Sequence, residues 1–201
     1  MVKQINNFLP LSYYLHDDVV EIAHDLIGKK LVTNFNGKLT SGIITETEAY
    51  AGETDKASHA YGGRRTARTE TMYAEGGISY VYLCYGIHHL FNIVTNKKNI
   101  PHAVLVRGIF PLDGWEIIQK RRKSSLPKHK IAAGPGTCSQ ALGISTKQNG
   151  ISLTNTRIWV ENAAIKAPQI KKGPRIGVDY AGKDAFLPYR FYVSDPLKIK
   201  L

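Results

Sequence analysis

Apolar residues alternate with polar or small residues in several stretches of the chain, as is typical of β-strands that bury one face. This alternation predicts strands over residues 30–34, 41–50, 79–84, 88–95 and 102–109, and two late strands over 157–161 and 189–193. Asn36-Gly37 lies between the first two strands, and this dipeptide favours a tight hairpin.

Apolar residues three or four positions apart predict two helices, over about 19–28 and 114–123. Either residue of Asp17-Asp18 can cap the first helix. The second ends in Lys120-Arg-Arg-Lys123, and cations are favourable at a helix C-terminus. A third, short helix is predicted over residues 136–143.

Three segments lack a clear period. Residues 1–16 are predicted to be an arm or loop, with Tyr13 and Tyr14 packed on the body. Residues 51–77 contain few aliphatic side chains and many Gly, Thr, Arg and Glu, which predicts a long ordered loop of functional importance. Residues 124–136 are predicted to be a basic connection that contains Pro and Gly.

The order of these elements predicts one α+β domain over residues 1–201. The strands cluster without a regular alternation with helices, which argues against a parallel doubly wound sheet. Hydrophobic residues make up 43% of the chain and charged residues 21%, which is ordinary for a globular protein.

The charge of the chain is unbalanced. Lys and Arg number 27 against 16 acids, which gives a formal net charge of +11. A basic surface binds polyanions by neutralising phosphates and releasing their counterions. Charge alone does not distinguish a nucleic-acid-binding protein from an ordinary basic protein.

The same composition bears on compartment and partners. No apolar run is long enough to cross a bilayer, and the N-terminal residues lack the apolar stretch of a secretory signal. Cys84 and Cys138 fit no disulfide framework or zinc pattern. We therefore expect a cytoplasmic protein, associated with the nucleoid if the source is bacterial, with no membrane partner.

Two carboxylates and a tyrosine share a face of the strand predicted over residues 41–50. Because side chains alternate along a strand, Glu46, Glu48 and Tyr50 project from the same side. A carboxylate can activate water for hydrolysis, and a tyrosine ring can hold a flat ligand. Two solvated acids on an exposed strand would have the same pattern.

The predicted loop contains a basic turn. Gly62-Gly63 precedes Arg64, Arg65 and Arg68, and we predict that these arginines contact a nucleic-acid backbone, because glycine permits close approach and arginine binds phosphate through two hydrogen bonds. His59 can hydrogen-bond a ligand or stack on it. A mobile basic loop with a surface histidine is the alternative.

Tyrosines mark the segment Tyr80-Val-Tyr-Leu-Cys-Tyr-Gly86. Tyr80 is expected to pack within the strand, whereas Tyr82 can stack on an extruded nucleotide. Tyr85 lies at the turn, where a ring has little core to fill. There it can wedge between base pairs and occupy the gap that the nucleotide leaves.

Two polar residues interrupt apolar strands. Asn92 can read the edge of a base or exclude a bulky substituent, or it can satisfy a neighbouring backbone group. Arg107 ends the apolar run Ala103–Val106, and such a charge is usually paired or directed at an anion. The histidines show no trustworthy metal-ligand spacing, so we expect no metal and no cofactor.

Together these segments resemble the alkyladenine (3-methyladenine) DNA glycosylase family, of the type found in mammals and many bacteria. The resemblance runs from about residue 9 to residue 195 and depends on the order and spacing of its motifs. The motifs are Glu46-Thr-Glu-Ala-Tyr50, His59 with Gly62-Gly-Arg64, Tyr80-Val-Tyr-Leu-Cys-Tyr-Gly86, Asn92, Val104-Leu-Val-Arg107, Ala133-Gly-Pro135, Gln140-Ala-Leu142, Pro174-Arg-Ile-Gly-Val178 and Arg190-Phe-Tyr-Val193.

The resemblance implies a role for each site residue. Glu48 would be the general base that activates the attacking water, and Arg107 would position that water and a nearby phosphate. The flipped base would be enclosed by Tyr50, His59 and Tyr82.

It also implies how DNA is opened and how bases are selected. Tyr85 would intercalate through the minor groove in place of the flipped base, and Asn92 would disfavour guanine by a clash with its exocyclic amine. The implied fold is a mixed α+β domain with a curved antiparallel sheet, flanking helices and a protruding β-hairpin.

The implied enzyme is a monofunctional DNA repair glycosylase. It would act as a monomer on double-stranded DNA that contains a damaged purine, such as 3-methyladenine, 7-methylguanine, hypoxanthine or ethenoadenine. This sequence departs from the animal members at Thr137-Cys138, where a Lys-Leu pair is expected, and at the basic insertion Asn96-Lys-Lys-Asn99. Neither departure involves Glu48.

Two other functions fit parts of the pattern. A non-catalytic nucleic-acid-binding protein could use the same aromatic and basic residues, and it would not need Glu48. A glycoside hydrolase could use Glu46 and Glu48 as an acid–base pair, because their Cα atoms would lie about 7 Å apart on a strand. The net charge of +11 argues against a sugar-binding groove.

Overall fold

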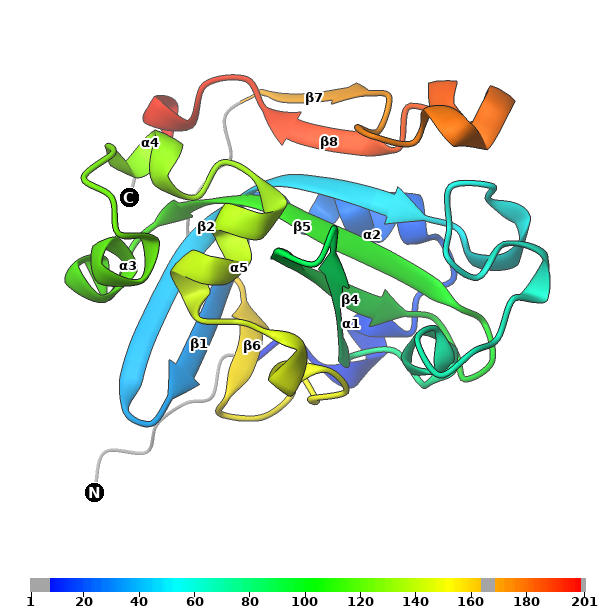
Figure 1. Cartoon of the computed structure of the whole chain (residues 1–201), viewed down its shortest axis with the longest axis horizontal. Helices are drawn as coiled ribbons and strands as arrows, with labels where there is room; N and C mark the ends of the chain where they lie inside the picture. The colour runs from blue at the N-terminus through cyan, green and yellow to red at the C-terminus, as the bar shows by residue number, and fades with distance from the viewer. Residues whose placement is uncertain (1–7, 164–168, 200–201) are drawn as a thin grey trace.

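The computed structural model describes residues 8–163 and 169–199, and within these ranges eight strands form one curved antiparallel sheet (Figure 1). The strands are β1 (Lys30–Phe35), β2 (Lys38–Tyr50), β3 (Ser79–Cys84), β4 (His88–Thr95), β5 (His102–Pro111), β6 (Ile158–Glu161), β7 (Ile170–Gly173) and β8 (Arg190–Val193). Their order is β3-β4-β5-β2-β1-β6, and β8 pairs with both β2 and β7. The predicted α+β class and curved antiparallel sheet are confirmed.

The long strand β2 connects the core to the candidate site. Its first half pairs with β1 and its second half with β8, while β5 lies along its other edge. The register between β2 and β5 shifts on both sides of Glu46, so that Thr45 on β2 and Arg107 on β5 are extra residues in the ladder. Bulges bend a strand and change where side chains point, and they are common beside active sites.

Helices cover both faces of the sheet, as Figure 1 shows. On one face α2 (Val19–Asp25) packs against β2, β5 and β8, and the Asp18 carboxylate caps its first turn. The other face carries α3 (Trp115–Arg122), α4 (Lys128–Ile131) and α5 (Pro135–Leu142), of which α5 contacts β4 and β5. A single helical turn, α1 (Leu11–Tyr14), precedes α2.

The apolar core lies on both sides of the central strands. Its fully buried side chains come from the sheet and from both helical layers, and they include Leu26, Ile44, Phe91, Ile109 and Leu142. Thr47, also fully buried, donates from its hydroxyl to the Ala23 carbonyl of α2 at 2.7 Å. Its neighbours Glu46 and Glu48 therefore lie on the opposite face of β2, as the alternation predicted.

All seven predicted strands and the three predicted helices are present, with ends shifted by a few residues. The long loop is ordered and contains three short 3₁₀ turns, Gly52–Thr54, Tyr61–Gly63 and Glu70–Tyr73. The Asn36-Gly37 turn is present, with both residues at positive φ. These features depend on local periodicity and turn chemistry, which a sequence carries directly.

Two predictions of irregular structure were wrong in part, and one strand was not predicted. Within residues 1–16, of which 1–7 lie outside the described residues, α1 is helical and its Tyr14 is fully buried. The basic connection over 124–136 contains α4. Strand β7 was missed because two of its four residues are lysines, and it forms where β8 offers an edge for pairing.

Candidate active site

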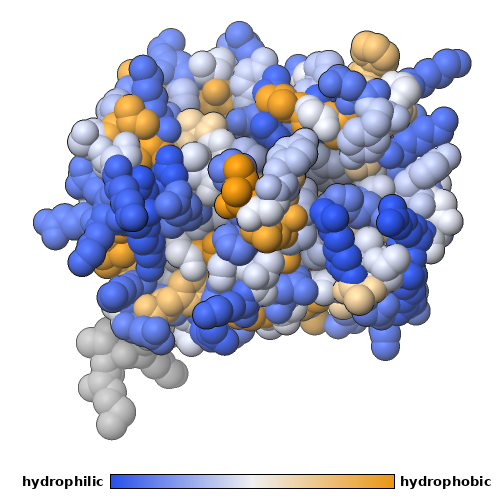
Figure 2. Space-filling model, viewed as in Figure 1, coloured by the Kyte–Doolittle hydropathy of each residue, from blue (hydrophilic) through white to orange (hydrophobic). Residues whose placement is uncertain are grey.

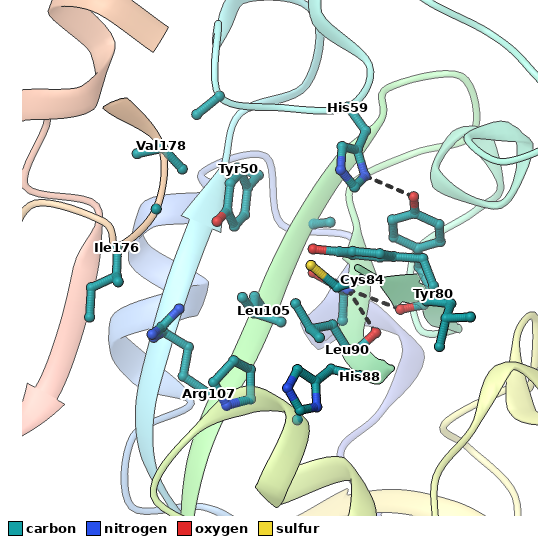
Figure 3. Close-up of a pocket in the computed structure, with 18 of the residues that line it drawn as sticks. Tyr50, His59, Tyr80, Cys84, His88, Leu90, Leu105, Arg107, Ile176 and Val178 are labelled. Atoms are coloured by element: carbon teal, nitrogen blue, oxygen red, sulfur yellow. Dashed lines mark hydrogen bonds between the residues drawn. The ribbon is translucent and has the colours of Figure 1, made fainter. Parts of the chain in front are cut away.

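A cavity of about 670 Å³ opens beside the hairpin of β3 and β4 (Figure 3). Its walls come from β2 to β5, the loop over residues 51–77, the start of α5 and residues 176–180. Most of the predicted site residues line it, namely Tyr50, His59, Arg68, Tyr82, Tyr85, Asn92 and Arg107. The fold thus brings together residues that lie far apart in the sequence.

Glu48 lies behind the cavity wall and is fully buried. The Tyr50 hydroxyl donates to its Oε2 at 2.8 Å, and the backbone N–H of Ile176 donates to its Oε1 at 2.8 Å. The Nη1 of Arg107 lies 3.2 Å from the same Oε1. All three contacts suit an ionised carboxylate, which accepts hydrogen bonds and donates none.

Arg107 lies between the two glutamates of β2. Its Nε donates to Glu46 Oε1 at 2.9 Å, while Nη1 contacts Glu48, so the guanidinium offsets the repulsion between the carboxylates. Arg190 of β8 donates to the same Glu46 oxygen at 3.1 Å. Burial lowers the pKa of Arg107, but the charges of Glu48 and Glu46 outweigh that effect and raise it above its ordinary value.

Arg107 reaches both glutamates from a bulge. It is the extra residue of β5 between Val106, which pairs with Thr47, and Gly108, which pairs with Glu46. The sequence left two roles open for Arg107, pairing with a carboxylate or contact with an anion. The structure shows the pairing. Figure 3 shows the Arg107 side chain on the same side of the cavity as Ile176.

One wall of the cavity is aromatic. The His59 ring packs edge-to-face on Tyr82, with ring centroids 4.7 Å apart, and its Nδ1 lies 3.0 Å from the Tyr80 hydroxyl. Figure 3 shows Tyr50 across the cavity from His59 and Tyr80. Tyr80 is buried, as expected for a packing residue.

The aromatic wall carries no charge near neutral pH. Burial, followed by the charges of Arg68 and Arg64, lowers the pKa of His59 to about 4. Burial raises the pKa of Tyr82, so its hydroxyl stays protonated. A flat ligand between Tyr50 and this wall would therefore contact neutral rings.

Asn92 is buried on β4 and uses its amide nitrogen on the backbone. Its Nδ2 donates to the Tyr80 carbonyl at 3.1 Å and to the Leu90 carbonyl at 3.3 Å. Both amide protons are thereby engaged, so only Oδ1 is left to meet a ligand. Of the alternatives for this residue, satisfaction of the backbone is observed.

Tyr85 projects from the tip of the β3–β4 hairpin. It is 89% exposed and has a φ of +51°, an unusual conformation for a bulky residue. Gly86 follows with a φ of +72°, and the Ile87 N–H closes the turn on the Cys84 carbonyl at 3.1 Å. Ile87 and Leu83 are also exposed, and Figure 2 shows hydrophobic atoms at the centre of this face.

The three arginines of the loop have different surroundings. Arg68 lies over the Tyr82 ring, 5.0 Å from its centroid, with Nη2 3.5 Å from His59 Nε2. Arg65 forms a two-point ion pair with Glu70, at 2.6 and 2.8 Å. Arg64 is exposed, and its side chain has no hydrogen-bond partner within the described ranges.

A buried ion pair supports the cavity, and sequence reasoning assigned it no role. Arg175 is almost fully buried, and its guanidinium bonds both carboxylate oxygens of Asp55 and the Ala49 carbonyl. The guanidinium carbon lies 4.9 Å from the Tyr50 ring centroid and 5.2 Å from that of Tyr189. Arg175 therefore fixes the end of β2, the loop and residues 174–178 in one arrangement.

The neighbours of Arg175 complete the site. Ile176 supplies the N–H that bonds Glu48, and a backbone donor leaves no mark in a sequence. Tyr180 lines the cavity, is 71% exposed, and donates from its hydroxyl to the Ala57 carbonyl at 3.1 Å. The Pro174–Val178 motif was the only sequence signal for this region.

Metal and membrane features can be checked over residues 8–163 and 169–199. There, no three His, Cys, Asp or Glu side chains lie close enough together to hold a metal ion. No helix in the same ranges combines the length and apolarity needed to span a bilayer. Both cysteines are free thiols, and burial raises the pKa of Cys138 to about 12.

Comparison with known proteins identifies the family of this chain. Residues 13–196 match the family model for methylpurine-DNA glycosylases, and the chain belongs to this family. A relative in Chlamydia felis is 49% identical over 187 residues, which cover 92% of this chain and 96% of the relative. Relatives in Clostridium perfringens and Bacillus cereus are each 43% identical, over 90% and 91% of this chain and 94% of their own length. All three carry the name "putative 3-methyladenine DNA glycosylase".

Proposed function

We propose that this protein is a monofunctional DNA glycosylase that removes alkylated or deaminated purines from duplex DNA. It flips the damaged nucleotide into the cavity and hydrolyses the N-glycosidic bond with a water activated by Glu48, which leaves an abasic site. The observation that carries this proposal is the position of Glu48, held by Arg107, Ile176 and Tyr50 directly behind an aromatic cavity.

The cavity suits a purine. Tyr50 on one side and His59 with Tyr82 on the other offer neutral ring faces and edges to a flat base. Base–aromatic stacking contributes about 1–3 kcal/mol for each base. A cationic base such as 3-methyladenine or 7-methylguanine gains a further attraction to electron-rich tyrosine rings. Neutral lesions, hypoxanthine and ethenoadenine, would depend on stacking and hydrogen bonds alone.

Glu48 has the acceptor capacity that the reaction requires. A carboxylate offers about four acceptor positions, and three are engaged by Tyr50, Ile176 and Arg107. The remaining position can take the attacking water. As the water oxygen bonds to C1′ of the sugar, its proton passes to Glu48, and the electron pair of the broken bond leaves with the base.

Arg107 has a double effect in this scheme. It pairs with the buried Glu48 and the half-buried Glu46, and its position on the cavity wall brings a cation close to the water. No lysine lines the cavity within the described residues, so an amine nucleophile is lacking there. Attack by water, without strand cleavage, is the reaction that these side chains favour.

The hairpin supplies the opening step. Extrusion of a nucleotide costs a few kcal/mol of stacking and pairing, and less at a weakened pair. Tyr85, held outside the body with Leu83 and Ile87 beside it, can enter the base stack and offset part of that cost. Asn92, which lines the cavity and is held by the Tyr80 and Leu90 carbonyls, would disfavour guanine by a clash with its exocyclic amine.

The test is base excision from a duplex oligonucleotide that carries one hypoxanthine or one 7-methylguanine. Abasic product is revealed by alkaline strand cleavage, and the wild type is compared with Glu48→Gln. Product from the wild type and none from the variant supports the proposal. Binding of DNA without excision of any lesion would instead favour a non-catalytic nucleic-acid-binding protein.

A further inference from the structure

The positive charge of this chain is concentrated in one segment. Between Ile117 and Val160 there are eight lysines and arginines and no aspartate or glutamate. The loop over residues 51–77, which sequence reasoning favoured for phosphate binding, contains four cations and four acids. The loop therefore contributes no net charge, and the whole of the +11 arises outside it.

Helices α3 and α4 and their connection display this charge on the surface. We define the basic ridge as the cations of this region, which are Lys120, Arg121, Arg122, Lys123, Lys128 and Lys130. Three of them, Lys120, Lys123 and Lys130, are exposed. Figure 2 shows strongly hydrophilic side chains gathered over α3 and α4, on the same face as the hydrophobic centre.

One carboxylate lies near the ridge: the Ser41 hydroxyl, and after it the charges of Lys30 and Lys128, lower the pKa of Asp113. Within residues 8–163 and 169–199, none of the ridge cations forms an ion pair with a carboxylate, whereas Arg65, Arg107 and Arg175 all do. Arg121 and Arg122 donate instead to neutral groups, the Ala141 carbonyl and the Ile131 carbonyl. Unpaired cations on one face create the positive potential that binds phosphates by counterion release.

The ridge adjoins the hairpin and the base cavity. A second hollow, of about 450 Å³, has Ile87 and His88 of the hairpin on one side and Arg121 with Gln140 on the other. The residues between the ridge and α5 lead into Gly134–Thr137, which line the first cavity. If the hairpin inserts into a duplex, the part of the duplex on this side of the hairpin would therefore lie over the ridge.

We propose that the basic ridge binds the phosphate backbone of the duplex beside the extruded nucleotide, on the side of the hairpin away from the loop over 51–77. This proposal depends on the proposed function, because that function places duplex DNA at the hairpin. Flexible lysines suit such contacts, since they act as point charges and carry no sequence information. The loop then builds the pocket wall, and the ridge supplies much of the affinity.

The test is the salt dependence of binding to an undamaged duplex, measured by fluorescence anisotropy. The ridge variant is Lys120→Gln with Lys123→Gln and Lys130→Gln. The matched control is Lys38→Gln with Lys171→Gln and Lys172→Gln, which removes the same charge from exposed positions outside the ridge. Each phosphate contact contributes about −0.9 to the slope of log K against log salt concentration. The ridge variant should lose about two to three from the slope, and the control less than about one.

Equal losses in the two variants, or an unchanged slope in the ridge variant, would overturn the proposal. The proposal would also be overturned if the ridge variant lost affinity for duplex RNA of the same length but kept its affinity for duplex DNA. A thermal melt of each variant excludes unfolding as the cause. Binding of undamaged DNA requires no bond cleavage. The proposal for the ridge can therefore be supported even if the protein excises no lesion.

Discussion

Two regions of the site differ in burial and in the number of their contacts. We call Glu48 and Arg107 the floor of the cavity, and Tyr85 the tip of the hairpin. At the floor, Glu48 and Arg107 are buried and each makes several polar contacts at fixed distances. At the tip, Tyr85 is 89% exposed, has a positive φ, and belongs to a turn closed by one backbone hydrogen bond. The floor is preorganised for chemistry, and the tip is available to another molecule. If this division is correct, substitutions should separate chemistry from DNA engagement.

The largest effect is expected from Glu48→Gln, which changes the floor alone. Gln keeps the shape of the side chain but cannot take a proton from water. General-base catalysis typically contributes about 10²–10⁴-fold, so the single-turnover excision rate should fall by about that factor. The Kd for lesion-containing duplex, measured by anisotropy, should change by less than about threefold. A comparable loss of binding would show that floor and tip are not separable.

Tyr85→Ala changes the tip alone and should give the next largest effect. Loss of one stacking ring costs about 1–3 kcal/mol, so affinity for the lesion duplex should fall by about 5- to 150-fold. At saturating protein the excision rate should stay within a few-fold of the wild type. Tyr85→Phe is the matched control, because it keeps the ring and removes only the hydroxyl. Wild-type affinity in the alanine variant would show that Tyr85 does not insert into the base stack.

Arg175→Lys tests whether the floor depends on its buried support. Lysine keeps the charge, but it cannot bond two oxygens of Asp55 in one plane or stack between two tyrosine rings. We expect kcat to fall by about tenfold with little change in KM, because Ile176 would shift from Glu48. A lower melting temperature with unchanged kcat would show that Arg175 stabilises the fold but does not position Glu48. Arg157→Lys, at an exposed position, should leave kcat unchanged.

Arg68→Met should change the relative kcat/KM for cationic and neutral lesions. Arg68 already lies over the Tyr82 ring and competes with a cationic base for its face. A cation–π contact contributes about 0.5–1 kcal/mol, so the ratio of kcat/KM for 7-methylguanine to that for hypoxanthine should rise about two- to fivefold. Arg64→Met should change both lesions alike. An unchanged ratio would mean that Arg68 leaves the pocket before the base enters.

The smallest effect concerns pH and the aromatic wall. The pKa of His59 is about 4 in the folded protein and about 6.5 in the unfolded chain. Below pH 6.5 the unfolded chain therefore gains a proton that the folded protein does not, and stability falls as the pH decreases toward 4. Thermal melts of His59→Gln should show a shallower decline over this range than those of the wild type. Parallel declines would show that His59 is protonated in the folded state.

The sequence predicted much of the architecture because the relevant signals are local. Alternation predicted the strands, and it placed Glu46, Glu48 and Tyr50 on one face of β2. Gly86 beside Tyr85 predicted the exposed tip. The signal failed where pairing with a neighbour creates an element. Strand β7 has no alternation of its own and forms on the edge of β8.

The site was predicted in outline and missed in detail. Nothing local shows that Arg65 is engaged by Glu70, or that Arg175 is buried against Asp55. The bulge that makes Arg107 an extra residue of β5 arises from pairing with β2. The N–H of Ile176 is a backbone group, which every residue but proline has. Such features depend on tertiary contacts, and only the folded chain reveals them.

The most direct test follows flipping and excision in one sample. Ethenoadenine in a duplex changes its fluorescence when it leaves the base stack, and its release can be measured afterwards as abasic product. With Glu48→Gln, we predict a fluorescence change of wild-type size, followed by abasic product at a rate about 10²–10⁴-fold below that of the wild type. Excision by this variant at the wild-type rate would contradict the central claim that Glu48 activates the attacking water.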